Sequence, residues 1–396
     1  MKLLFVHDLF GAHGGAETNI FATGAEFKQR GHVVGMLHGP GTGRNEAAWR
    51  ETFYWRFPLA GGVAAARATL LKFKPDIIYV HKLADLDVLE AIVKSGVPCV
   101  RFVHDHELYC MRSYKYHPLT RAICHRPVSL YCLFPCGACV ARNRASRFPF
   151  KWVSYLAKKR EIRLNRQFQR LVVYSEYSRQ ELIRNGFDPR RIEIHVPMRL
   201  EPGGVASSFS SRNLILYAGQ IIRGKGVDVL LESLAQVQVP FECLILGDGS
   251  HRAYCENLSR ELGLTDRVRF RGFIKPDELA NYYRQCSVAV VSSVWPEPFG
   301  MVGPEAMRHG LPVVAFDVGG ISEWLINGVN GYLVPRMDRA RFAARVQELL
   351  CDKILARQMG ERGRQMVCEE YELSAHITAL ERMFDRVNSE AKNLAT

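Results

Sequence analysis

Long apolar runs are absent from this 396-residue sequence. No run reaches the roughly 18–20 consecutive apolar residues that a membrane-spanning helix needs, so we expect no transmembrane segment. The first residues, Met1 to Asp8, are apolar only briefly, which predicts a first β-strand rather than a signal peptide. We therefore expect a cytoplasmic protein in which the 11 cysteines are mostly reduced.

Several other patterns are also missing from the chain. It contains no internal repeat, no low-complexity segment and no G-x-G-x-x-G fingerprint of dinucleotide-binding loops. Its hydrophobic content of 47% and its mixed charges argue against disorder and favour a folded protein. A length of 396 residues is sufficient for two domains of about 200 residues each.

Acidic residues are scarce in the first half of the chain. Residues 1–199 hold 31 Lys and Arg against 16 Asp and Glu, a net charge of +15. Residues 200–396 hold 22 against 24, a net charge of −2. The two halves are therefore expected to meet different partners, and nucleic acid, anionic lipid or an acidic acceptor would each suit the basic half. None of the recognised nucleic-acid-binding motifs is present, so we expect no nucleic-acid partner.

Apolar, β-branched segments alternate with helical segments from one end of the chain to the other. This alternation predicts an α/β protein whose parallel sheets are covered by helices on both faces. A Gly- and Ser-rich stretch at 201–211 separates two sets of strands and is expected to be a linker. The expected strands are Leu3–His7, His32–Leu37, Phe53–Phe57, Asp76–Val80, Val97–Val103, Leu171–Tyr174, Ile192–Val196, Leu214–Ala218, Phe241–Leu246, Val268–Phe270, Val288–Val291, Val313–Phe316 and Tyr332–Val334.

The stretch from Ser293 to Glu305 carries the clearest chemical signal. Glu297 follows an apolar strand and precedes a Pro-Phe-Gly turn, and Glu305 is expected about two turns into the next helix. A loop that runs from a strand into a helix offers backbone N–H groups to an anionic or hydroxyl-rich ligand. Carboxylates beside such a loop can accept hydrogen bonds from sugar hydroxyls.

This stretch, continued through residues 310–315 and 328–334, closely resembles the C-terminal signature of the family-4 retaining glycosyltransferases, which have the GT-B fold. In that family the first Glu contacts hydroxyls of the donor sugar and the second binds the ribose of the nucleotide. The resemblance implies these roles for Glu297 and Glu305. It also implies that the backbone of Phe299, Gly300 and Met301 lies beside the sugar and the phosphates.

The resemblance covers nearly the whole chain and implies two doubly wound, Rossmann-like domains that face each other across a cleft. The implied domains are an acceptor-side domain at 1–200, a linker at 201–211, a nucleotide-sugar-binding domain at 212–372, and a C-terminal helix at 373–396 that packs back on the first domain.

Two motifs in the first half support the same resemblance. The first strand ends in a Gly14–Gly15 turn, where the missing Cβ atoms let the backbone approach a ligand at the carboxyl edge of the sheet. The Gly-Gly-Ala-Glu sequence resembles the family's loop, so Gly14 and Gly15 are expected to contact donor or acceptor. His104 ends another strand and matches the family histidine that lies over the donor sugar. Asp105, or a backbone group, is expected to hold its tautomer.

A second glycine turn follows the first strand of the second half. Gly219 leads to Arg223 and Lys225, and two cations at a helix start would clamp a diphosphate and neutralise leaving-group charge. The family usually has an Arg directly after the first glycine, where this chain has Gln220. Arg223 is therefore the candidate for the missing cation, whereas Lys225 matches the family lysine. Phe273 matches the loop whose backbone reads the nucleotide base.

The resemblance implies a hexosyltransferase-type enzyme that moves a sugar from a nucleoside-diphosphate sugar to a hydroxyl of a glycan or lipid-linked acceptor. The expected process is cell-surface polysaccharide or glycolipid synthesis. Retention in this family is explained by front-face attack, so catalysis rests on positioning and charge stabilisation, and no catalytic cofactor is required. A metal-binding role for the Asp85-Leu86-Asp87 triplet is rejected, because it lies at an expected helix start. The alternative function is a catalytically silent scaffold that binds sugar nucleotide or zinc.

A Cys-rich insert is expected at residues 106–145. Its last four cysteines have the spacing C-x7-C-x3-C-x2-C, and the end of this pattern resembles half of a structural zinc site. The spacing is not that of a standard zinc finger, so zinc and free or occasionally oxidised thiols both stay open. A disulfide framework is least expected in the cytoplasm. The candidate zinc ligands are Cys124, Cys132, Cys136 and Cys139.

Residues 142–170 contain ten Lys or Arg and a single acid, interleaved with aromatic residues. On one continuous helix, Lys159, Arg163, Arg166 and Arg170 would share a face. A basic and aromatic segment of this kind is typical of a helix that lies on anionic lipid, and the solvated face of an ordinary domain helix has the same composition. Both interpretations stay open. The first predicts a peripheral protein on the inner face of the membrane.

Overall fold

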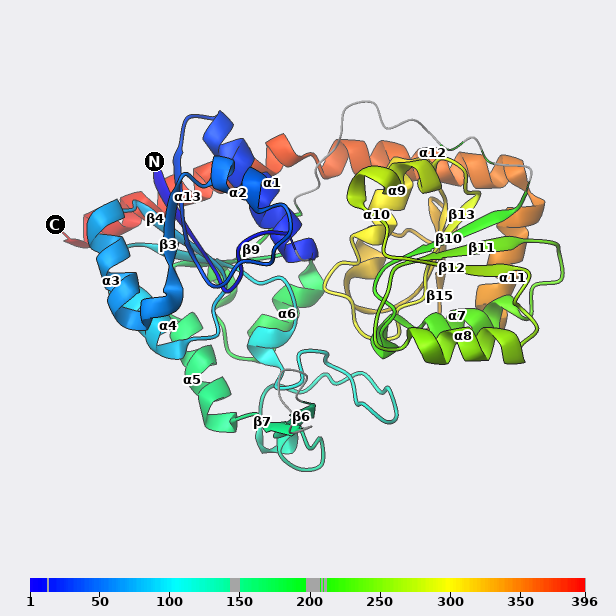
Figure 1. Ribbon diagram of the computed structural model, residues 1–396, viewed down its shortest axis with the longest axis horizontal. Coiled ribbons are helices and arrows are strands. Elements are labelled where there is room, and N and C mark those ends of the chain that lie inside the picture. The colour runs from blue at the N-terminus through cyan, green and yellow to red at the C-terminus, as the bar shows by residue number, and fades with distance from the viewer. Residues whose placement is uncertain (13, 143–149, 197–206, 208, 210–211, 396) are drawn as a thin grey trace. The chain divides into compact units, whose positions relative to one another are not determined.

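The structure, a computed structural model, describes residues 1–12, 14–142, 150–196, 207, 209 and 212–395 (Figure 1). It divides into two compact units. Unit 1 consists of Met1–Tyr114, His125–Arg199 and Tyr371–Thr396, and unit 2 consists of Lys115–Cys124 and Leu200–Glu370. Most of the expected linker at 201–211 lies outside the described residues.

Unit 1 is built on a parallel sheet of seven strands in the order β3-β2-β1-β4-β5-β8-β9. In this order the chain builds outward from β1 on one side and then on the other, which creates a switch point between β1 and β4. Ligands of doubly wound sheets bind at the carboxyl ends of strands at such a point. The strands are β1 (Lys2–His7), β2 (Val33–His38), β3 (Trp55–Pro58), β4 (Ile77–Lys82), β5 (Cys99–Phe102), β8 (Arg170–Val173) and β9 (Ile192–Ile194).

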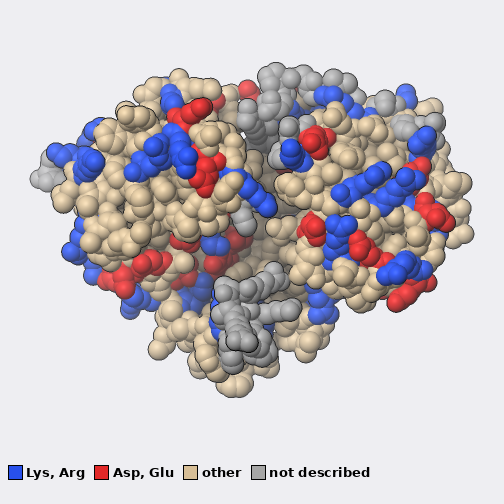
Figure 2. All heavy atoms as spheres, viewed as in Figure 1, with Lys and Arg blue, Asp and Glu red and all other residues tan. Residues whose placement is uncertain are grey.

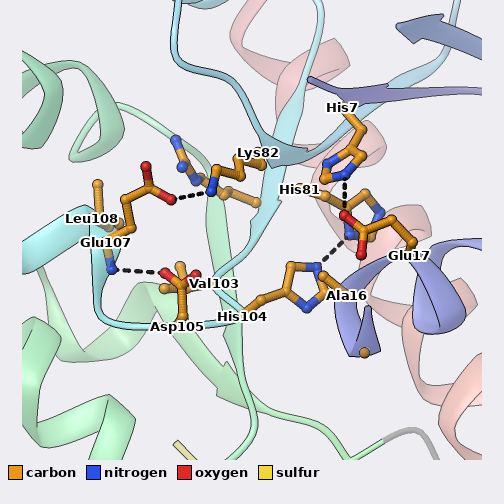
Figure 3. Close-up of a pocket in the computed structure, with 12 residues that line it drawn as sticks. His7, Ala16, Glu17, His81, Lys82, Val103, His104, Asp105, Glu107 and Leu108 are labelled. Atoms are coloured by element: carbon orange, nitrogen blue, oxygen red, sulfur yellow. Dashed lines mark hydrogen bonds and ion pairs between the residues drawn. The ribbon is translucent and has the colours of Figure 1, made fainter. Parts of the chain in front are cut away.

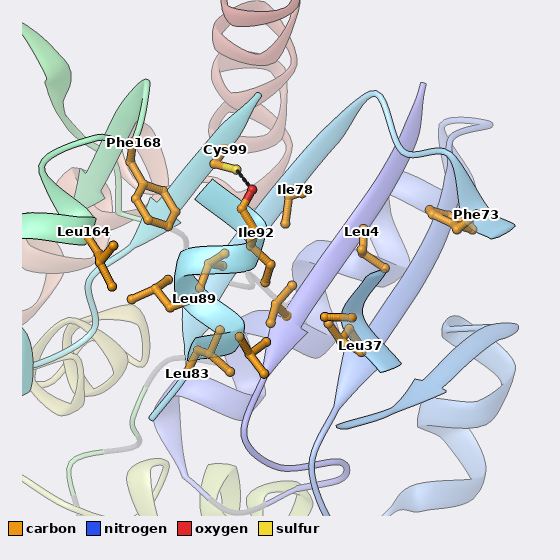
Figure 4. Close-up of a cluster of buried hydrophobic side chains, with 14 residues drawn as sticks. Leu4, Leu37, Phe73, Ile78, Leu83, Leu89, Ile92, Cys99, Leu164 and Phe168 are labelled. Atoms are coloured by element: carbon orange, nitrogen blue, oxygen red, sulfur yellow. Dashed lines mark hydrogen bonds between the residues drawn. The ribbon is translucent and has the colours of Figure 1, made fainter. Parts of the chain in front are cut away.

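Helices cover both faces of this sheet. Successive side chains of β1 point to opposite faces, so they pack against different helices. Leu4 and Val6 pack in a cluster with side chains of α3, α4 and α5 (Figure 4). Phe5 contacts Phe27 of α1, and Phe27 stacks on Phe384 of α13 with ring centroids 5.7 Å apart. The helices are α1 (Gly15–Gln29), α2 (Glu46–Thr52), α3 (Gly62–Phe73), α4 (Leu86–Val93), α5 (Tyr155–Asn165), α6 (Glu176–Arg184) and α13 (Leu373–Ala395).

The prediction of one continuous basic helix in the second part of 142–170 is wrong. A short antiparallel pair, β6 (Val140–Arg142) and β7 (Phe150–Trp152), precedes α5. Ser154 caps α5 by accepting a hydrogen bond from the Ala157 N–H at 3.1 Å, and the helix ends at Asn165. Arg166 lies at the C-cap and Arg170 opens β8, so the four cations do not share one helix.

Unit 2 is built on a parallel sheet of six strands in the order β12-β11-β10-β13-β14-β15. Its switch point lies between β10 and β13. Both of these strands are buried along their whole length, which explains why they read as continuous apolar runs in the sequence. The strands are β10 (Leu214–Ala218), β11 (Glu242–Leu246), β12 (Val268–Gly272), β13 (Val288–Val291), β14 (Val313–Phe316) and β15 (Gly331–Val334).

Each strand expected from the sequence has a counterpart within a few residues, and the two-domain Rossmann-like α/β class is confirmed. The helices of unit 2 are α7 (Val227–Leu234), α8 (Arg252–Glu261), α9 (Pro276–Tyr283), α10 (Val302–Arg308), α11 (Arg339–Cys351) and α12 (Lys353–Glu370). Short 3-10 turns are η1 (Leu59–Gly61), η2 (Glu107–Tyr109), η3 (Leu130–Cys132), η4 (Pro189–Arg191), η5 (Arg223–Lys225) and η6 (Gly319–Glu323).

The helix that carries Glu305 begins closer to this residue than the sequence suggested. α10 starts at Val302, so Glu305 lies in its first turn and not two turns along. Gly303 is required at this start, because a Cβ atom there would lie 1.9 Å from the ring of Trp324. The same indole donates a hydrogen bond to the Phe299 carbonyl at 2.6 Å, which fixes the turn before the helix.

The C-terminal helix α13 belongs to unit 1. Its Glu381 accepts hydrogen bonds from Arg30 at 2.9 Å and from His32 at 2.8 Å, both at the C-terminal end of α1. One stripe of α13 is fully buried, as the spacing of an amphipathic helix requires. This stripe consists of Ile377, Leu380, Met383, Phe384 and Val387. Among the described helices, none combines the length and the apolar character needed to cross a membrane.

Candidate functional site

A polar cavity of about 200 Å³ lies at the switch point of unit 1 (Figure 3). It is lined from the carboxyl ends of β1, β4 and β5 and from the first turn of α1. The expected site residues Gly15 and His104 are among its lining residues. The others are His7, Ala16, Glu17, His81, Lys82, Arg101, Val103, Asp105, Glu107 and Leu108.

The start of α1 is fixed by Glu17, the last residue of the Gly-Gly-Ala-Glu motif. Glu17 accepts a hydrogen bond from the Gly14 N–H at 2.8 Å, and its Oε1 atom lies 2.9 Å from His7 Nε2. Burial alone would raise the pKa of Glu17, but the hydrogen bond and charge of His7 outweigh it and lower that pKa to about 2. The Gly14–Gly15 turn is therefore held by an ionised, buried carboxylate.

His104 sits in a chain of buried polar groups. Its Nε2 atom lies 2.9 Å from Nδ1 of His81, and its Nδ1 atom lies 2.8 Å from the Tyr174 hydroxyl. Asn19 donates to the same hydroxyl at 3.1 Å, so Tyr174 has its own proton to give to His104. The expectation that Asp105 or a backbone group holds the tautomer is wrong. Asp105 instead accepts a hydrogen bond from the Glu107 N–H at 2.7 Å.

This chain keeps the imidazole of His104 neutral. Burial, reinforced by the nearby charge of His7, lowers the pKa of His104 to about 3. Burial also lowers the pKa of His81 well below its ordinary value. His104 therefore presents an uncharged ring to the cavity, and both of its nitrogens already have partners within unit 1.

The opposite wall of the cavity carries charged groups. Lys82 forms an ion pair with Glu107. Arg101 is buried and donates to the Asn165 side chain at 2.7 Å. Burial, with the charge of Glu107, raises the pKa of Asp105 above its ordinary value. These groups give the cavity both hydrogen-bond donors and acceptors, which suits a ligand rich in hydroxyls.

In unit 2, two of the candidates from the sequence, Lys225 and Glu297, meet at the switch point. Lys225 Nζ lies 2.7 Å from Glu297 Oε1, and Trp295 Nε1 donates to the same oxygen at 2.7 Å. Ser293 Oγ also donates to Oε1. Every hydrogen bond that the described residues make to the Glu297 carboxylate goes to Oε1. Its other oxygen, Oε2, accepts none of these hydrogen bonds.

The Glu297 side chain is only 4% exposed, whereas that of Lys225 is 23% exposed. Burial would raise the pKa of Glu297, but the charge of Lys225 and the hydrogen bonds from Ser293 and Trp295 outweigh burial and lower that pKa. The carboxylate is therefore ionised at neutral pH. Lys225 also lies 5.3 Å from the centre of the Trp295 ring, so the indole orders both members of the pair.

Arg223 does not join this pair. Its guanidinium donates to the Pro118 carbonyl and, at 3.3 Å, to the Leu119 carbonyl. Gln220, at the position where the family usually has Arg, is exposed, and its carbonyl accepts a hydrogen bond from the Tyr217 hydroxyl at 2.9 Å. The assignment of Arg223 to a diphosphate stays a prediction, and the structure gives this side chain a second role.

Glu305 lies four residues beyond Met301, whose carbonyl accepts a hydrogen bond from the Glu305 N–H at 3.0 Å. The side chain is half-buried, and burial raises the pKa of Glu305 to about 7 despite the opposing charge of Arg308. Glu297 and Glu305 thus differ in protonation, because Glu297 is paired with Lys225 and accepts hydrogen bonds from Ser293 and Trp295.

The remaining donor-site candidates lie on loops of unit 2. Gly219 has a φ of +149° and its N–H bonds the Leu246 carbonyl at 2.9 Å, so the turn after β10 needs glycine. Gly300 has a φ of +85°, which turns the chain from the Glu297 loop into α10. Phe299 is buried, and Met301 is the N-cap of α10. Phe273 is 65% exposed after β12. The ligand role of Phe273 stays a prediction.

The four candidate zinc ligands do not form a metal site in the described structure. Within the described ranges, no group of three or more Cys, His, Asp or Glu side chains is placed to hold a metal ion. Cys124, Cys132, Cys136 and Cys139 are half-buried and do not form disulfides with the described residues. The zinc ion therefore stays a prediction. Asp85 of the rejected Asp-Leu-Asp triplet caps α4 by accepting from the Asp87 and Val88 N–H groups.

Several residues of these sites were not expected from the sequence. Glu17, His81 and Tyr174 in unit 1 and Trp295 in unit 2 each contact an expected site residue, and His7 contacts Glu17. A simple signal could have found His7 and His81. Each is a polar residue at the carboxyl end of a strand next to the switch point, the same placement that pointed to His104.

Known proteins match both parts of the chain. The family model "Glycosyltransferase Family 4" matches residues 13–195, and the model "Glycosyl transferases group 1" matches residues 205–366. An uncharacterised glycosyltransferase of Methanocaldococcus jannaschii is 31% identical over 196 residues, which cover 48% of this chain and 50% of that protein. A D-inositol 3-phosphate glycosyltransferase of Streptomyces bingchenggensis is 32% identical over 219 residues, covering 48% and 47%. The chain thus spans about half the length of the curated relatives it matches.

Among solved structures, Anabaena HepE in complex with UDP-glucose superposes with a TM-score of 0.74 at 19% identity. The match covers 98% of this chain and 100% of that chain. At this identity the likeness concerns the fold, and it extends over both units.

Proposed function

Because the chain belongs to the family-4-type glycosyltransferases of the GT-B fold, we propose that it transfers a sugar from a nucleoside-diphosphate sugar to an acceptor hydroxyl. The observation that carries this proposal is the Lys225–Glu297 pair at the switch point of unit 2, with its 2.7 Å contact. A buried carboxylate with an oxygen left to accept, beside a partly exposed ammonium, suits a ligand that joins sugar hydroxyls to a diphosphate.

The proposed chemistry uses each member of the pair for one end of the donor. Lys225 attracts the diphosphate and stabilises its charge as the glycosidic bond breaks. Glu297 accepts a hydrogen bond from a donor-sugar hydroxyl through Oε2 and orients the ring. The acceptor hydroxyl attacks from the face that the diphosphate leaves, and a diphosphate oxygen takes its proton, so the anomeric configuration is retained. Glu305 accepts from the ribose hydroxyls, and neutral His104 borders the sugar.

The first donor to test is UDP-glucose, because HepE was crystallised with UDP-glucose. The assay measures release of nucleoside diphosphate from a panel of UDP-, GDP- and ADP-sugars, with and without candidate glycan or lipid-linked acceptors. We expect acceptor-dependent release with one donor, and release reduced about tenfold to a hundredfold in Glu297→Gln. Binding of a sugar nucleotide without release under any acceptor would favour the silent-scaffold alternative. Retention is tested by the anomeric configuration of the product.

We also propose that the enzyme meets its acceptor at an anionic membrane surface, in polysaccharide or glycolipid synthesis at the inner face of the membrane. The segment around the Cys-rich insert exposes large apolar side chains in unit 1. Phe134 and Trp152 are 83% and 82% exposed, and Leu130 and Leu156 are 68% and 77% exposed. Exposed apolar groups of this size beside cations support shallow insertion into a charged leaflet.

The cations available for that contact are fewer than the sequence suggested. Lys158 bonds Glu161, Arg160 bonds Asp87 and Glu90, and Arg170 bonds Glu193 and Glu390. On the face shown in Figure 2, basic and acidic side chains lie interspersed. The exposed cations of this segment whose side chains make neither an ion pair nor a hydrogen bond with a described residue are Lys151, Lys159 and Arg163. Arg166 is also exposed, but it donates to the Asn185 carbonyl.

Liposome co-sedimentation tests the membrane proposal. The enzyme should bind vesicles that contain anionic lipid, and binding should fall at high salt. Changing Lys151, Lys159 and Arg163 to Glu should abolish binding, because each basic residue near an anionic leaflet contributes about 1 kcal/mol. Equal binding to neutral and anionic vesicles would overturn the proposal. The matched control carries the same change of charge at three exposed positions of α3 and its C-cap, Arg67, Lys72 and Lys74.

A further inference from the structure

Ten residues of the Cys-rich insert are built into unit 2. Residues Lys115–Cys124 belong to that unit, although the sequence on either side belongs to unit 1. Tyr116 and Ile123 form an antiparallel bridge, and the Cys124 N–H donates to the Lys115 carbonyl at 2.8 Å. We call this element the 115–124 hairpin. From the sequence, all of residues 1–200 were expected to form one domain.

Arg121 attaches the hairpin to the first turn of α7. Its guanidinium lies 2.5 Å from Oδ2 of Asp228, and the two side chains are only 9% and 12% exposed. Its carbonyl accepts a hydrogen bond from Arg336, and Arg336 also donates to the Val294 carbonyl at 2.8 Å. Through Arg336, the hairpin is therefore joined to the loop that carries Glu297.

The hairpin also holds the η5 turn that carries Lys225. Arg223 donates to the Pro118 and Leu119 carbonyls at the hairpin tip. Gly224 lies between two rings, because a Cβ atom there would be 3.2 Å from Trp295 and 3.4 Å from Tyr116. The Gly224 carbonyl accepts from the Val294 and Trp295 N–H groups. The η5 turn is thus enclosed by the hairpin on one side and the Glu297 loop on the other.

The backbone of the hairpin is strained at Arg121. This residue has a φ of +59°, a conformation that residues other than glycine rarely adopt. In that conformation, the Arg121 carbonyl bonds Arg336 and its guanidinium bonds Asp228. Strain of this kind persists only where the surrounding contacts determine the conformation, and it is frequent at functional sites.

We propose that the 115–124 hairpin is a part of the donor site, and that Arg121 is its positioning residue. By holding the η5 turn and, through Arg336, the Glu297 loop, the hairpin keeps the Lys225 ammonium beside the Glu297 carboxylate. A segment between two parts of the acceptor-side unit therefore sets the geometry of the donor-binding unit. This inference rests on the proposed transfer of a sugar from a nucleoside diphosphate.

The test compares Arg121→Met with wild type in the full-length enzyme. We expect donor KM to rise and kcat to fall, with a combined loss of about 2- to 30-fold in kcat/KM. KM for the acceptor should stay unchanged. Hydrogen–deuterium exchange should increase at residues 221–226 and 292–298 and stay unchanged in the unit 1 sheet. Arg126→Met, an exposed arginine five residues further along in unit 1, is the matched control.

Two outcomes would overturn the inference while leaving the proposed function intact. One is a folded Arg121→Met enzyme with wild-type donor kinetics. The other is unchanged exchange in the two donor loops. A wild-type enzyme that turns over no donor would instead refute the proposed function itself, and the exchange experiment would still decide the structural role of the hairpin.

A second variant covers the case in which Arg121→Met does not fold. Arg223 is exposed, so Arg223→Met should fold, and it severs the contact with the hairpin tip. If Arg223 acts through the hairpin, exchange at residues 115–124 increases in Arg223→Met, and adding Arg121→Lys reduces kcat/KM by less than the product of the single losses. Unchanged exchange at the hairpin, with losses that multiply, would overturn the inference and favour direct binding of diphosphate by Arg223.

Discussion

Replacing Lys225 by Met should destabilise unit 2, because it leaves a buried carboxylate without its cation. The Glu297 side chain is 4% exposed and that of Lys225 is 23% exposed. Removing one partner of a buried ion pair costs about 3–5 kcal/mol. Ser293 and Trp295 still donate to Glu297 in the variant, and Lys225 is partly exposed, so we expect about 3 kcal/mol. For a unit of this size, the melting temperature should fall by roughly 6–12 °C.

The loss of stability should depend on pH in a defined direction. In the wild type, the charge of Lys225 and the hydrogen bonds to Glu297 overcome burial and lower the pKa of Glu297. The ionised carboxylate therefore contributes stability above its ordinary pKa of 4.5, and this contribution is lost as pH falls through the lowered pKa. In Lys225→Met, burial prevails and raises the pKa of Glu297. Protonation then relieves the unpaired charge, so the difference from wild type should be smaller at pH 5 than at pH 8.

Thermal unfolding at pH 5 and pH 8 measures both effects. Lys275→Met removes an exposed lysine from the same unit and serves as the control. The double variant Lys225→Met/Glu297→Gln should be more stable than Lys225→Met at pH 8, because no buried charge is left. Lys225→Met alone should bind nucleoside diphosphate at least tenfold more weakly than the wild type. A melting temperature equal to that of the control at both pH values would refute the role assigned to the pair.

Three further predictions concern other residues of the sites. Burial raises the pKa of Glu305 to about 7, so the stability that its neutral form contributes should fall as pH rises from its ordinary pKa of 4.5 towards 7. The affinity for nucleoside diphosphate should rise as pH passes 7. Isothermal titration should show that Glu305→Gln abolishes this pH dependence of the affinity. Tyr174→Phe removes a buried hydrogen bond to His104 and should cost about 1–3 kcal/mol in urea unfolding and slow transfer, whereas Tyr54→Phe, at an exposed position, should do neither. If the cysteines bind zinc, purified protein should carry near-stoichiometric metal and a chelator should lower its melting temperature; metal analysis that finds none would establish the free-thiol alternative.

The arrangement of strands could be predicted from the sequence because buried parallel strands carry their own signal. Val288–Val291 and Val313–Phe316 are apolar along their whole length, since each is covered on both faces. The Lys225–Glu297 contact follows from the same logic. Both residues lie on loops that leave the carboxyl ends of neighbouring strands at a switch point.

Contacts that depend on side-chain direction or on distant segments could not be predicted in this way. The basic residues of 142–170 repeat at helical spacing, but charge spacing alone does not show where Ser154 starts a helix or where Arg170 enters a buried sheet. The His81–His104 contact and the Arg121–Asp228 ion pair each join positions that no local pattern relates. Asp105 was an incorrect partner for His104, because adjacency in sequence was taken for adjacency in space.

The division of the chain also has a consequence for its synthesis on the ribosome. Unit 1 needs α13, which buries Phe384 against Phe27 of α1, yet residues 200–370 of unit 2 are translated before α13. The seven-stranded sheet is therefore translated first, and one of its apolar faces stays incompletely covered while unit 2 is translated. Domains generally fold as they leave the ribosome, but here the unit that begins first is completed last. A nascent chain stalled before Tyr371 should accordingly recruit chaperones that bind exposed apolar surface.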